Sequence, residues 1–288
     1  MAEYRLVDPP GHLPTDTEEQ KIKRYLLNAA DHGAVQVRRR TIVIGVRKDV
    51  DEGHRMSYPA PVRNRRPKNT RSVPAQMLDG GPGPSYWEAV DRVFEESAKL
   101  QLAGTELPAG DKHIGDIGLK LPGIYTTDDL HIRRQPKQLS VARYLAIPPG
   151  GNRKALEGKW YTVNKNGAFE FYTEPCPEGV KTAVEYLSTD SWDKHTTGTG
   201  DVMGRLRLGE PSVTIRTEFF KPEKGRYLHP TDPRPITHFE AARIQGFPRD
   251  FRWCGSKTEI AKQIGNAVPI PLGTAVASAI YACLRPSD

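Results

Sequence analysis

The stretch Arg234-Pro-Ile-Thr-His-Phe-Glu-Ala-Ala-Arg-Ile-Gln-Gly-Phe-Pro-Arg-Asp-Phe251 carries the clearest structural signals in this 288-residue chain. Thr237 and Glu240 stand three positions apart, which is the spacing of a helix capping box. In that motif the threonine oxygen accepts an orphan backbone N–H, and the glutamate reaches back to the cap. Gly246 with Pro248 behind it is typical of a helix C-terminus, so we expect a short helix between the two signals.

Two further helices are expected downstream of this stretch. Ser256 and Glu259 repeat the capping-box spacing and predict a helix that ends near Ile264–Gly265. Pro271 then suits the first turn of a third helix, because its missing N–H would have no partner there anyway. The apolar side of this third helix contains Leu272, Val276 and Ile280.

Toward the N-terminus, extended segments replace helices. Gln36-Val-Arg-Arg-Arg40 leads into the β-branched run Thr41–Val46, which predicts a strand buried on both faces of a parallel or mixed sheet. Lys159–Val163 and Ala168–Tyr172 flank the turn Asn164-Lys-Asn-Gly167 and predict a β-hairpin. With 26 glycines and 25 prolines, the chain is expected to have many turns and irregular connections.

Composition narrows the class of protein. The 42 Lys and Arg against 35 Asp and Glu give a formal charge of +7, which favours a polyanionic partner. No run of eighteen apolar residues and no secretory leader is visible, so neither a membrane span nor secretion is expected. Three widely spaced cysteines predict no disulfide framework and no metal site, and they fit the reducing cytoplasm. A helix is also expected from Ser85 to about Leu102.

Three of these stretches resemble, in order, signature motifs of the cytosine-C5 DNA methyltransferases. Arg234–Phe251 and Lys262-Gln-Ile-Gly-Asn-Ala-Val-Pro269 resemble that family's motifs IX and X. Gln36–Arg40 resembles motif VIII, which is Gln-x-Arg-x-Arg leading into a strand, and Gly204–Phe219 is similar to the end of the target-recognition domain. The resemblance covers about residues 24–49 and 128–284, and three motifs in the family's order make it specific.

The resemblance implies an α/β fold with two parts. One is the trailing strand and helices of a doubly wound, Rossmann-like methyltransferase domain, and the other is an irregular, mixed-β target-recognition domain. The implied divisions are a partial catalytic domain with the motif VIII strand (1–49), a basic, proline-rich insertion and helix (50–127), the target-recognition domain (128–233), and motifs IX and X returning to the catalytic domain (234–288).

Other motifs of the family are not found ahead of Gln36: its Phe-x-Gly-x-Gly loop for S-adenosylmethionine, its Pro-Cys nucleophile and its Glu-Asn-Val carboxylate. Pro175-Cys176 falls inside the recognition region, so Cys176 is not expected to be the nucleophile. The resemblance therefore implies the second subunit of a split bacterial or phage modification enzyme, inactive alone. A separate chain would carry the missing motifs and form a heterodimer with it, and the face Leu272–Ile280 would be exposed without that chain.

The family's chemistry assigns roles to the matching residues. A cysteine thiolate adds to C6 of a cytosine rotated out of duplex DNA, and the activated ring attacks the methyl group of S-adenosylmethionine. By resemblance Arg40 donates to cytosine O2, since a guanidinium stays protonated and suits an oxygen that gains negative charge. Arg38 would contact phosphate or brace the nucleophile loop, and Gln36 would order the approach. The residues that match the wall of the S-adenosylmethionine pocket are Gly265, Asn266, Ala267 and Val268.

Sequence choice is expected from roughly residues 128–217, where arginine would read guanine and asparagine or glutamine would read adenine. The candidate contacts to double-stranded DNA are Arg133, Arg134, Arg205, Arg207, Thr214, Ile215 and Arg216. Within motif IX, Arg234, Glu240 and Arg243 are expected to organise the recognition domain rather than to touch substrate.

Two alternatives remain open at the level of sequence. The chain could be a DNA-binding remnant or module that kept target recognition and lost catalysis. It could also be an unrelated basic enzyme that uses His113, His131 or His195 with nearby acids, although no spacing supports this.

Overall fold

The computed structural model describes residues 3–51, 53, 55–65, 86–108, 123–175, 177–180, 183–194 and 201–285. The α-helices in this part are α1 (Glu18–Arg24), α2 (Asp91–Ser97), α4 (Gln138–Ala146), α5 (Asp190–Asp193), α6 (His238–Gln245), α7 (Lys257–Asn266) and α8 (Ile270–Leu284). The 3-10 turns are η1 (Ala29–His32), η4 (Asp128–Leu130), η5 (Arg153–Leu156) and η6 (Pro222–Lys224). The strands are β1 (Tyr4–Leu6), β2 (Leu26–Asn28), β3 (Arg39–Thr41), β4 (Gly45–Arg47), β5 (Ile124–Thr126), β6 (Trp160–Val163), β7 (Phe169–Tyr172), β8 (Glu185–Tyr186) and β9 (Arg252–Cys254).

The architecture is α/β, with mixed helices and small sheets. The strands named above form three two-stranded sheets, β1–β4, β2–β3 and β5–β9, and one three-stranded sheet in the order β7-β6-β8. Every pairing between these strands is antiparallel. Thus the described residues contain no parallel doubly wound sheet, and helices and irregular segments supply most of the packing.

The prediction of one buried strand over Thr41–Val46 is wrong. The run is divided between β3, which pairs with β2, and β4, which pairs with β1. Between them Ile44 is buried, whereas the Val43 side chain is 56% exposed. A three-residue strand with one short antiparallel neighbour has no sheet to cover both of its faces, so the β-branched residues do not form the continuous buried strand that their composition favours.

Several local predictions are confirmed. The hairpin forms from β6 and β7 with Trp160 opposite Tyr172, and Gly167 closes the turn at a φ of +79°. Both capping boxes are present, at the start of α6 and at the start of α7. Gly246 ends α6 in the left-handed conformation at a φ of +91°, where a side chain would be strained. Pro271 occupies the first turn of α8.

The helix expected from Ser85 to Leu102 forms only in its middle, as α2. Ser85 lies outside the described residues, and the cap residue Val90 has no side-chain oxygen to satisfy the first turn. Val90 and Phe94 are buried, whereas Ala98 after the end of α2 is exposed.

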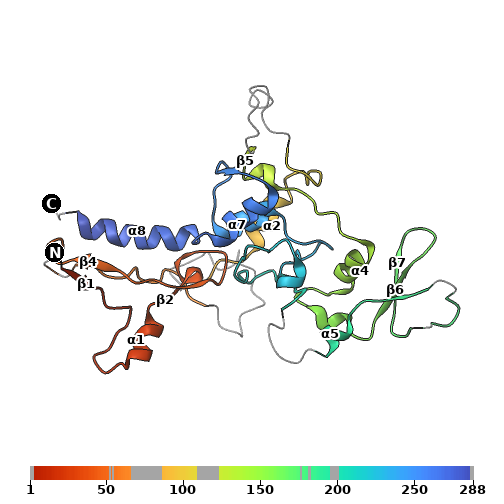
Figure 1. Cartoon of the computed structure of the whole chain (residues 1–288), viewed down its shortest axis with the longest axis horizontal. Coiled ribbons are helices and arrows are strands. Elements are labelled where there is room, and N and C mark those ends of the chain that lie inside the picture. Colours follow the sequence, from red (N-terminus) through yellow and green to blue (C-terminus); the bar gives the residue numbers. More distant parts are fainter. Residues whose placement is uncertain are drawn as a thin grey trace, which may run out of the picture.

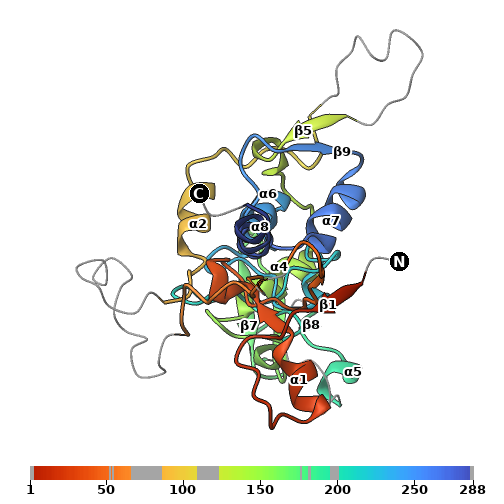
Figure 2. The ribbon, with the colours of Figure 1, turned by 90° about the vertical axis from the view of Figure 1, so that its left-hand side faces the viewer.

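Three buried apolar clusters hold these elements together. The largest is built on α6, which packs against α2, α7 and η4 and buries Phe239 and Ile244 completely. A second cluster joins the N-terminal strands to Leu272 of α8, and a third packs α4, η5 and β6 around Leu156. The molecule is elongated, with α8, β1 and β4 at one end and the β6–β7 hairpin at the other (Figure 1). Seen from the α8 end, β5 and β9 lie above that helix and α1 lies below it (Figure 2).

Helix α8 is apolar on nearly all sides, yet only Leu272 and Cys283 are fully buried among its fifteen residues. The expected exposure of the face Leu272–Ile280 is therefore wrong for its first half, because the N-terminal cluster covers Leu272 and partly covers Val276. The exposed apolar side chains lie toward the end of the helix instead. They are Ile280 at 39%, Tyr281 at 55% and Leu284 at 57% exposure.

The described residues contain neither a single membrane-spanning helix nor a cluster of metal ligands. No single helix there is long and apolar enough to cross a membrane; α7 and α8 together meet the length and composition, but a 46° bend separates them. No group of three or more His, Cys, Asp or Glu in the described ranges is placed to hold a metal ion.

Candidate functional site

Gln36 joins three segments that are far apart in the sequence. Its side chain is completely buried, and its Oε1 accepts the Ile215 backbone N–H at 3.1 Å. Its Nε2 donates to Gln245 Oε1 on α6 at 2.6 Å, and Gln245 Nε2 donates in turn to the Ile264 carbonyl on α7. Both ends of the Gln36 amide are therefore satisfied, and they tie the segment before β3 to the recognition segment and to α6.

Arg38 forms a second buried connection beside Gln36. Its side chain donates to the Ile215 carbonyl at 2.6 Å and to the Gly265 carbonyl at 2.9 Å. Burial, and to a smaller degree the positive charge of Arg40, lowers the pKa of Arg38 to about 10, so the guanidinium remains charged at neutral pH. Charge-assisted hydrogen bonds are stronger than neutral ones, so this side chain holds the end of α7 against the segment around Ile215.

Gly265 allows α7 to approach that segment unusually closely. A Cβ placed on Gly265 would lie 2.3 Å from the Thr217 backbone nitrogen and 2.5 Å from the Arg216 carbonyl carbon. Both atoms belong to the main chain and cannot rotate away as a flexible side chain could. The close approach therefore requires glycine at this position.

We expect Gly265→Ala to lower the free energy of unfolding by about 2 kcal/mol, because overpacking against backbone exceeds the gain in helix propensity. Gly273→Ala in α8 is the matched control, since a Cβ there has no atom within 4 Å. The free energy of unfolding of the control is expected to stay unchanged or to rise by up to about 1 kcal/mol. Urea denaturation of both variants measures the difference, and equal stabilities would show that the junction relaxes without cost.

Arg40 and the residues that follow Gly265 are more exposed than Gln36 and Arg38. Arg40 is half-buried, and one of its terminal nitrogens donates to the Arg39 carbonyl at 2.7 Å. Asn266 is exposed, Val268 is 47% exposed, and Ala267 packs partly on the core. The structure thus brings Gln36, Arg38 and Gly265 into one contact network, while Arg40, Asn266 and Val268 remain accessible to other molecules.

The candidate DNA contacts divide into buried and exposed groups. Arg205 is only 3% exposed, and its guanidinium donates to the carbonyls of Ile147, His229, Asp232 and Tyr144. Ile215 is fully buried, and the Thr214 hydroxyl donates to the Val37 carbonyl at 2.9 Å. These three side chains stabilise the fold in this structure and do not point outward. The exposed candidates are Arg133, Arg134, Arg207 and Arg216.

A buried ion pair organises the start of α6. Both oxygens of Glu240, a residue with no exposed surface, accept from Arg234 at 2.8 and 2.9 Å. Burial opposes ionisation of Glu240, but its hydrogen bonds and ion pair with Arg234 keep the pKa of this carboxyl below its ordinary value. Arg243 pairs with Glu96 of α2 at 2.9 Å. These contacts stabilise the start of α6 and its packing on α2.

Two buried histidines beside this ion pair predict acid sensitivity. Burial lowers the pKa of His229 and of His238 to about 4, from an ordinary value of 6.5. Between these values the unfolded chain binds protons that the folded chain does not. Stability therefore falls as the pH falls, by up to about 1.4 kcal/mol per pH unit for each histidine.

Urea midpoints measured between pH 6.5 and 5 test this expectation. In this range the histidines act alone, because protonation of Glu240 lowers stability only at lower pH. His229→Gln should flatten the dependence on pH, and His12→Gln on the half-exposed N-terminal segment is the control. A dependence that His229→Gln leaves unchanged would remove His229 as a cause.

Comparison with known proteins connects these contacts to a family. The sequence model of the C-5 cytosine-specific DNA methylases matches residues 20–282, which is most of the chain. This chain belongs to that family. The matched region contains the whole network around Gln36, Arg38 and Gly265.

The relatives of this chain include bacterial type II methyltransferases. The type II methyltransferase M.HindV of Haemophilus influenzae is 41% identical over 48% of this chain and 49% of its own length. M.XorII of Xanthomonas oryzae is 29% identical over 90% of this chain and 50% of its own length. The chain thus spans about half the length of these two relatives. A crystal structure described as a DNA modification methyltransferase encoded within an Escherichia coli prophage covers 98% of this chain and 69% of its own, with 16% identity and a TM-score of 0.47.

Some contacts in the structure were not predicted from the sequence. Gln245 lies inside the motif IX stretch, but no pattern there indicates that its amide bridges Gln36 and α7. His131, one of the residues of the alternative enzyme hypothesis, is buried with its ring nitrogen 3.1 Å from the Thr237 hydroxyl. His113, His195 and Cys176 lie outside the described residues.

Proposed function

We propose that this methylase chain supplies the target-recognition and cofactor-wall part of a DNA cytosine-5-methyltransferase, and that a second chain supplies the catalytic thiol. The observation that carries the proposal is the buried network of Gln36 and Arg38. It joins motif VIII, the recognition segment at Ile215 and motif X at Gly265. Such a network would keep the bound DNA and the methyl donor in one fixed relation, which catalysis by positioning requires.

Arg40 would act on the target base. It follows Arg38 by two residues, so the buried Arg38 side chain anchors the strand from which Arg40 extends. In this proposal a free N–H of Arg40 donates to cytosine O2, where negative charge grows when the thiolate adds to C6. Because the guanidinium stays protonated, no proton has to move at this position during the addition.

S-adenosylmethionine, which supplies the methyl group when bound, fits the chemistry of the accessible motif X residues. Asn266 offers an exposed amide that can both donate and accept, and Val268 offers exposed apolar surface beside it. A polar amide next to apolar side chains suits a nucleoside with a polar ring edge and an apolar face. In the proposal these residues form one wall of the cofactor pocket, and the second chain forms the opposite wall.

The exposed apolar surface at the end of α8 supports a second chain. Tyr281 and Leu284 are each more than half exposed, and Tyr4 and Leu6 of β1 are 67% and 63% exposed. A cavity of about 320 Å³ between them is lined by Ile280 and by residues of β4. Exposed apolar patches of this kind mark interaction surfaces. The 288 residues also contain no Phe-x-Gly-x-Gly or Glu-Asn-Val motif, so a methyltransferase sheet bearing those motifs is the occupant that we propose.

The test is reconstitution with the chain that carries the glycine loop, the Pro-Cys pair and the Glu-Asn-Val motif. Transfer of labelled methyl from S-adenosylmethionine to duplex DNA is expected from the mixture and from neither chain alone. Tyr281→Glu should abolish complex formation, whereas Phe171→Ser on the distant β7 strand should not. Methyl transfer by the isolated chain would refute the two-chain enzyme. DNA binding without transfer in any mixture would instead identify a recognition module that has lost catalysis.

A further inference from the structure

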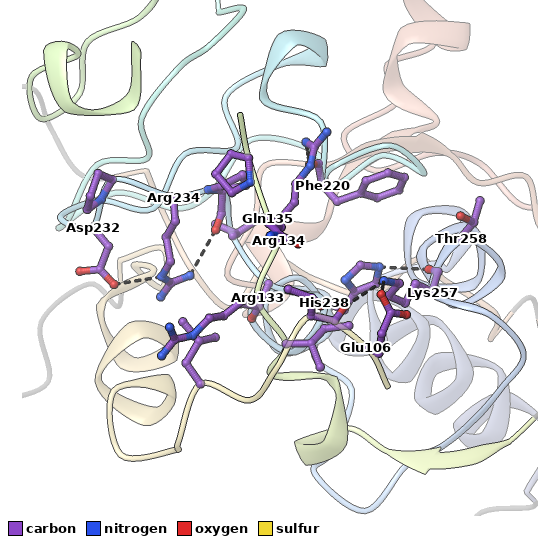
Figure 3. Close-up of a pocket in the computed structure, with 18 residues that line it drawn as sticks. Glu106, Arg133, Arg134, Gln135, Phe220, Asp232, Arg234, His238, Lys257 and Thr258 are labelled. Atoms are coloured by element: carbon purple, nitrogen blue, oxygen red, sulfur yellow. Dashed lines mark hydrogen bonds and ion pairs between the residues drawn. The ribbon is translucent and has the colours of Figure 1, made fainter. Parts of the chain in front are cut away.

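A large cavity lies between the recognition region and motif IX, away from Gln36 and Gly265. Its volume of about 640 Å³ falls within the range of ordinary ligand sites, about 300–1000 Å³. Segments that are distant in the sequence form its walls: residues 132–136, Phe220, residues 232–238, and Lys257 at the start of α7. Figure 3 shows the charged side chains of Asp232 and Arg234 on one side and Phe220, His238 and Lys257 on the other.

The charges around the cavity leave a positive end. Arg234 is neutralised by Glu240 and Asp232, and Lys257 pairs with Glu106 at 2.8 Å. Among the residues that the structure describes, Arg133 is exposed and its guanidinium has no hydrogen-bond or ion-pair partner. Arg134 uses one terminal nitrogen to donate to the Phe220 carbonyl at 2.6 Å and is otherwise exposed. Arg133 therefore favours an anionic group on the ligand, whereas Arg134 is held at the Phe220 side of the cavity.

The opposite end of the cavity is aromatic and apolar. Phe220 is half-buried, and its ring stacks on the ring of His238 at 5.7 Å with an angle of 15°. The Ile132 and Ile236 side chains add apolar wall. A planar ligand with a π-face would match this end, because aromatic side chains stack on such rings.

We propose that this cavity holds an unstacked nucleotide of the bound DNA other than the target cytosine, with its base near Phe220 and its phosphate at Arg133. This inference rests on the proposed function. Lys257 at the cavity and Asn266 at the cofactor wall are at opposite ends of α7, about 14 Å apart at 1.5 Å per residue. The cavity is therefore too far from the motif X wall to receive the base that is methylated. Holding a second base outside the stack would fix the register of the DNA and contribute to sequence choice.

Binding of bulged duplexes to the full chain tests the proposal without knowledge of the target sequence. Three labelled duplexes are compared: fully paired, with one bulged 2-aminopurine nucleotide, and with a bulged abasic nucleotide. The bulged base is expected to improve binding at least about fivefold over the abasic bulge, the size of one base–aromatic stack. Free mononucleotide at the same concentration should not compete, which separates a DNA strand from a soluble nucleotide as the source of the ligand.

Phe220→Leu should abolish the preference for the bulged base while keeping the apolar contact to the core. Arg133→Ala should weaken binding of all three duplexes and reduce the dependence on salt by about one phosphate contact. Phe171→Leu on β7 and Arg92→Ala on α2 are the matched controls, and both should bind as the parent does.

Equal binding of the base and abasic bulges, or a preference that survives Phe220→Leu, would overturn the inference and leave the proposed function intact. The inference would also be overturned if the cavity variants bound DNA normally and failed only to bind the catalytic chain. The cavity would then be a protein interface. Failure of the parent chain to bind any duplex would overturn both.

Discussion

An Arg38→Ala variant is expected to lose about 3 kcal/mol of free energy of unfolding. The substitution removes two charge-assisted hydrogen bonds and leaves the carbonyls of Ile215 and Gly265 without these donors in a buried site. Loss of the buried charge gives back some desolvation energy, but the orphaned carbonyls and the space left by the side chain cost more. Urea denaturation at neutral pH measures the change.

Two further variants separate the causes of this loss. Arg38→Met keeps most of the volume and removes only the donors, so it should remain destabilised by at least about 1.5 kcal/mol. Arg38→Lys keeps the charge, but a single ammonium group cannot match the fork that reaches both carbonyls, so it should recover only part of the loss. If Arg38→Met were as stable as the parent, the two hydrogen bonds would contribute nothing to the junction.

The starts of the last three helices, and the end of the first of them, could be predicted because their signals are local, whereas strand β9 and the burial of Leu272 could not. A capping box specifies a helix start within four residues, as at Thr237 and Ser256, and Gly246 ends a helix through its own backbone preference. The family motifs are local in the same sense. They covered about residues 24–49 and 128–284, and the family model matches residues 20–282. They also included residues that the network joins, although they did not predict the contacts themselves.

The remaining predictions failed where tertiary neighbours decide the outcome. Thr41–Val46 has the composition of a buried strand, but the partners β1 and β2 are only three residues long and pair with different halves of the run. Arg205 has the character of a DNA contact in sequence, and only the fold shows that four carbonyls converge on its guanidinium. Leu272 is covered by residues that lie more than two hundred positions earlier. Such long-range contacts cannot be predicted from the local amino-acid composition.

Arg40→Ala is expected to reduce methyl transfer by the reconstituted methylase about 30-fold or more in kcat/KM, which corresponds to at least ~2 kcal/mol of transition-state stabilisation. The reason is the loss of a permanently charged donor to cytosine O2 while charge develops on the ring. The effect should appear mainly in kcat, because that hydrogen bond strengthens in the transition state. Single-turnover methylation with saturating DNA isolates the chemical step.

Arg39→Ala is the matched control for Arg40, since it removes a neighbouring exposed guanidinium and keeps the Arg39 carbonyl that accepts from Arg40. It should change the rate little beyond a loss of electrostatic attraction to DNA that salt suppresses. Arg40→Lys should recover part of the rate, because it returns the charge without the fork. Equal rates for Arg40→Ala and the parent would exclude Arg40 from the chemical step and would make motif VIII, through Gln36 and Arg38, a structural element alone.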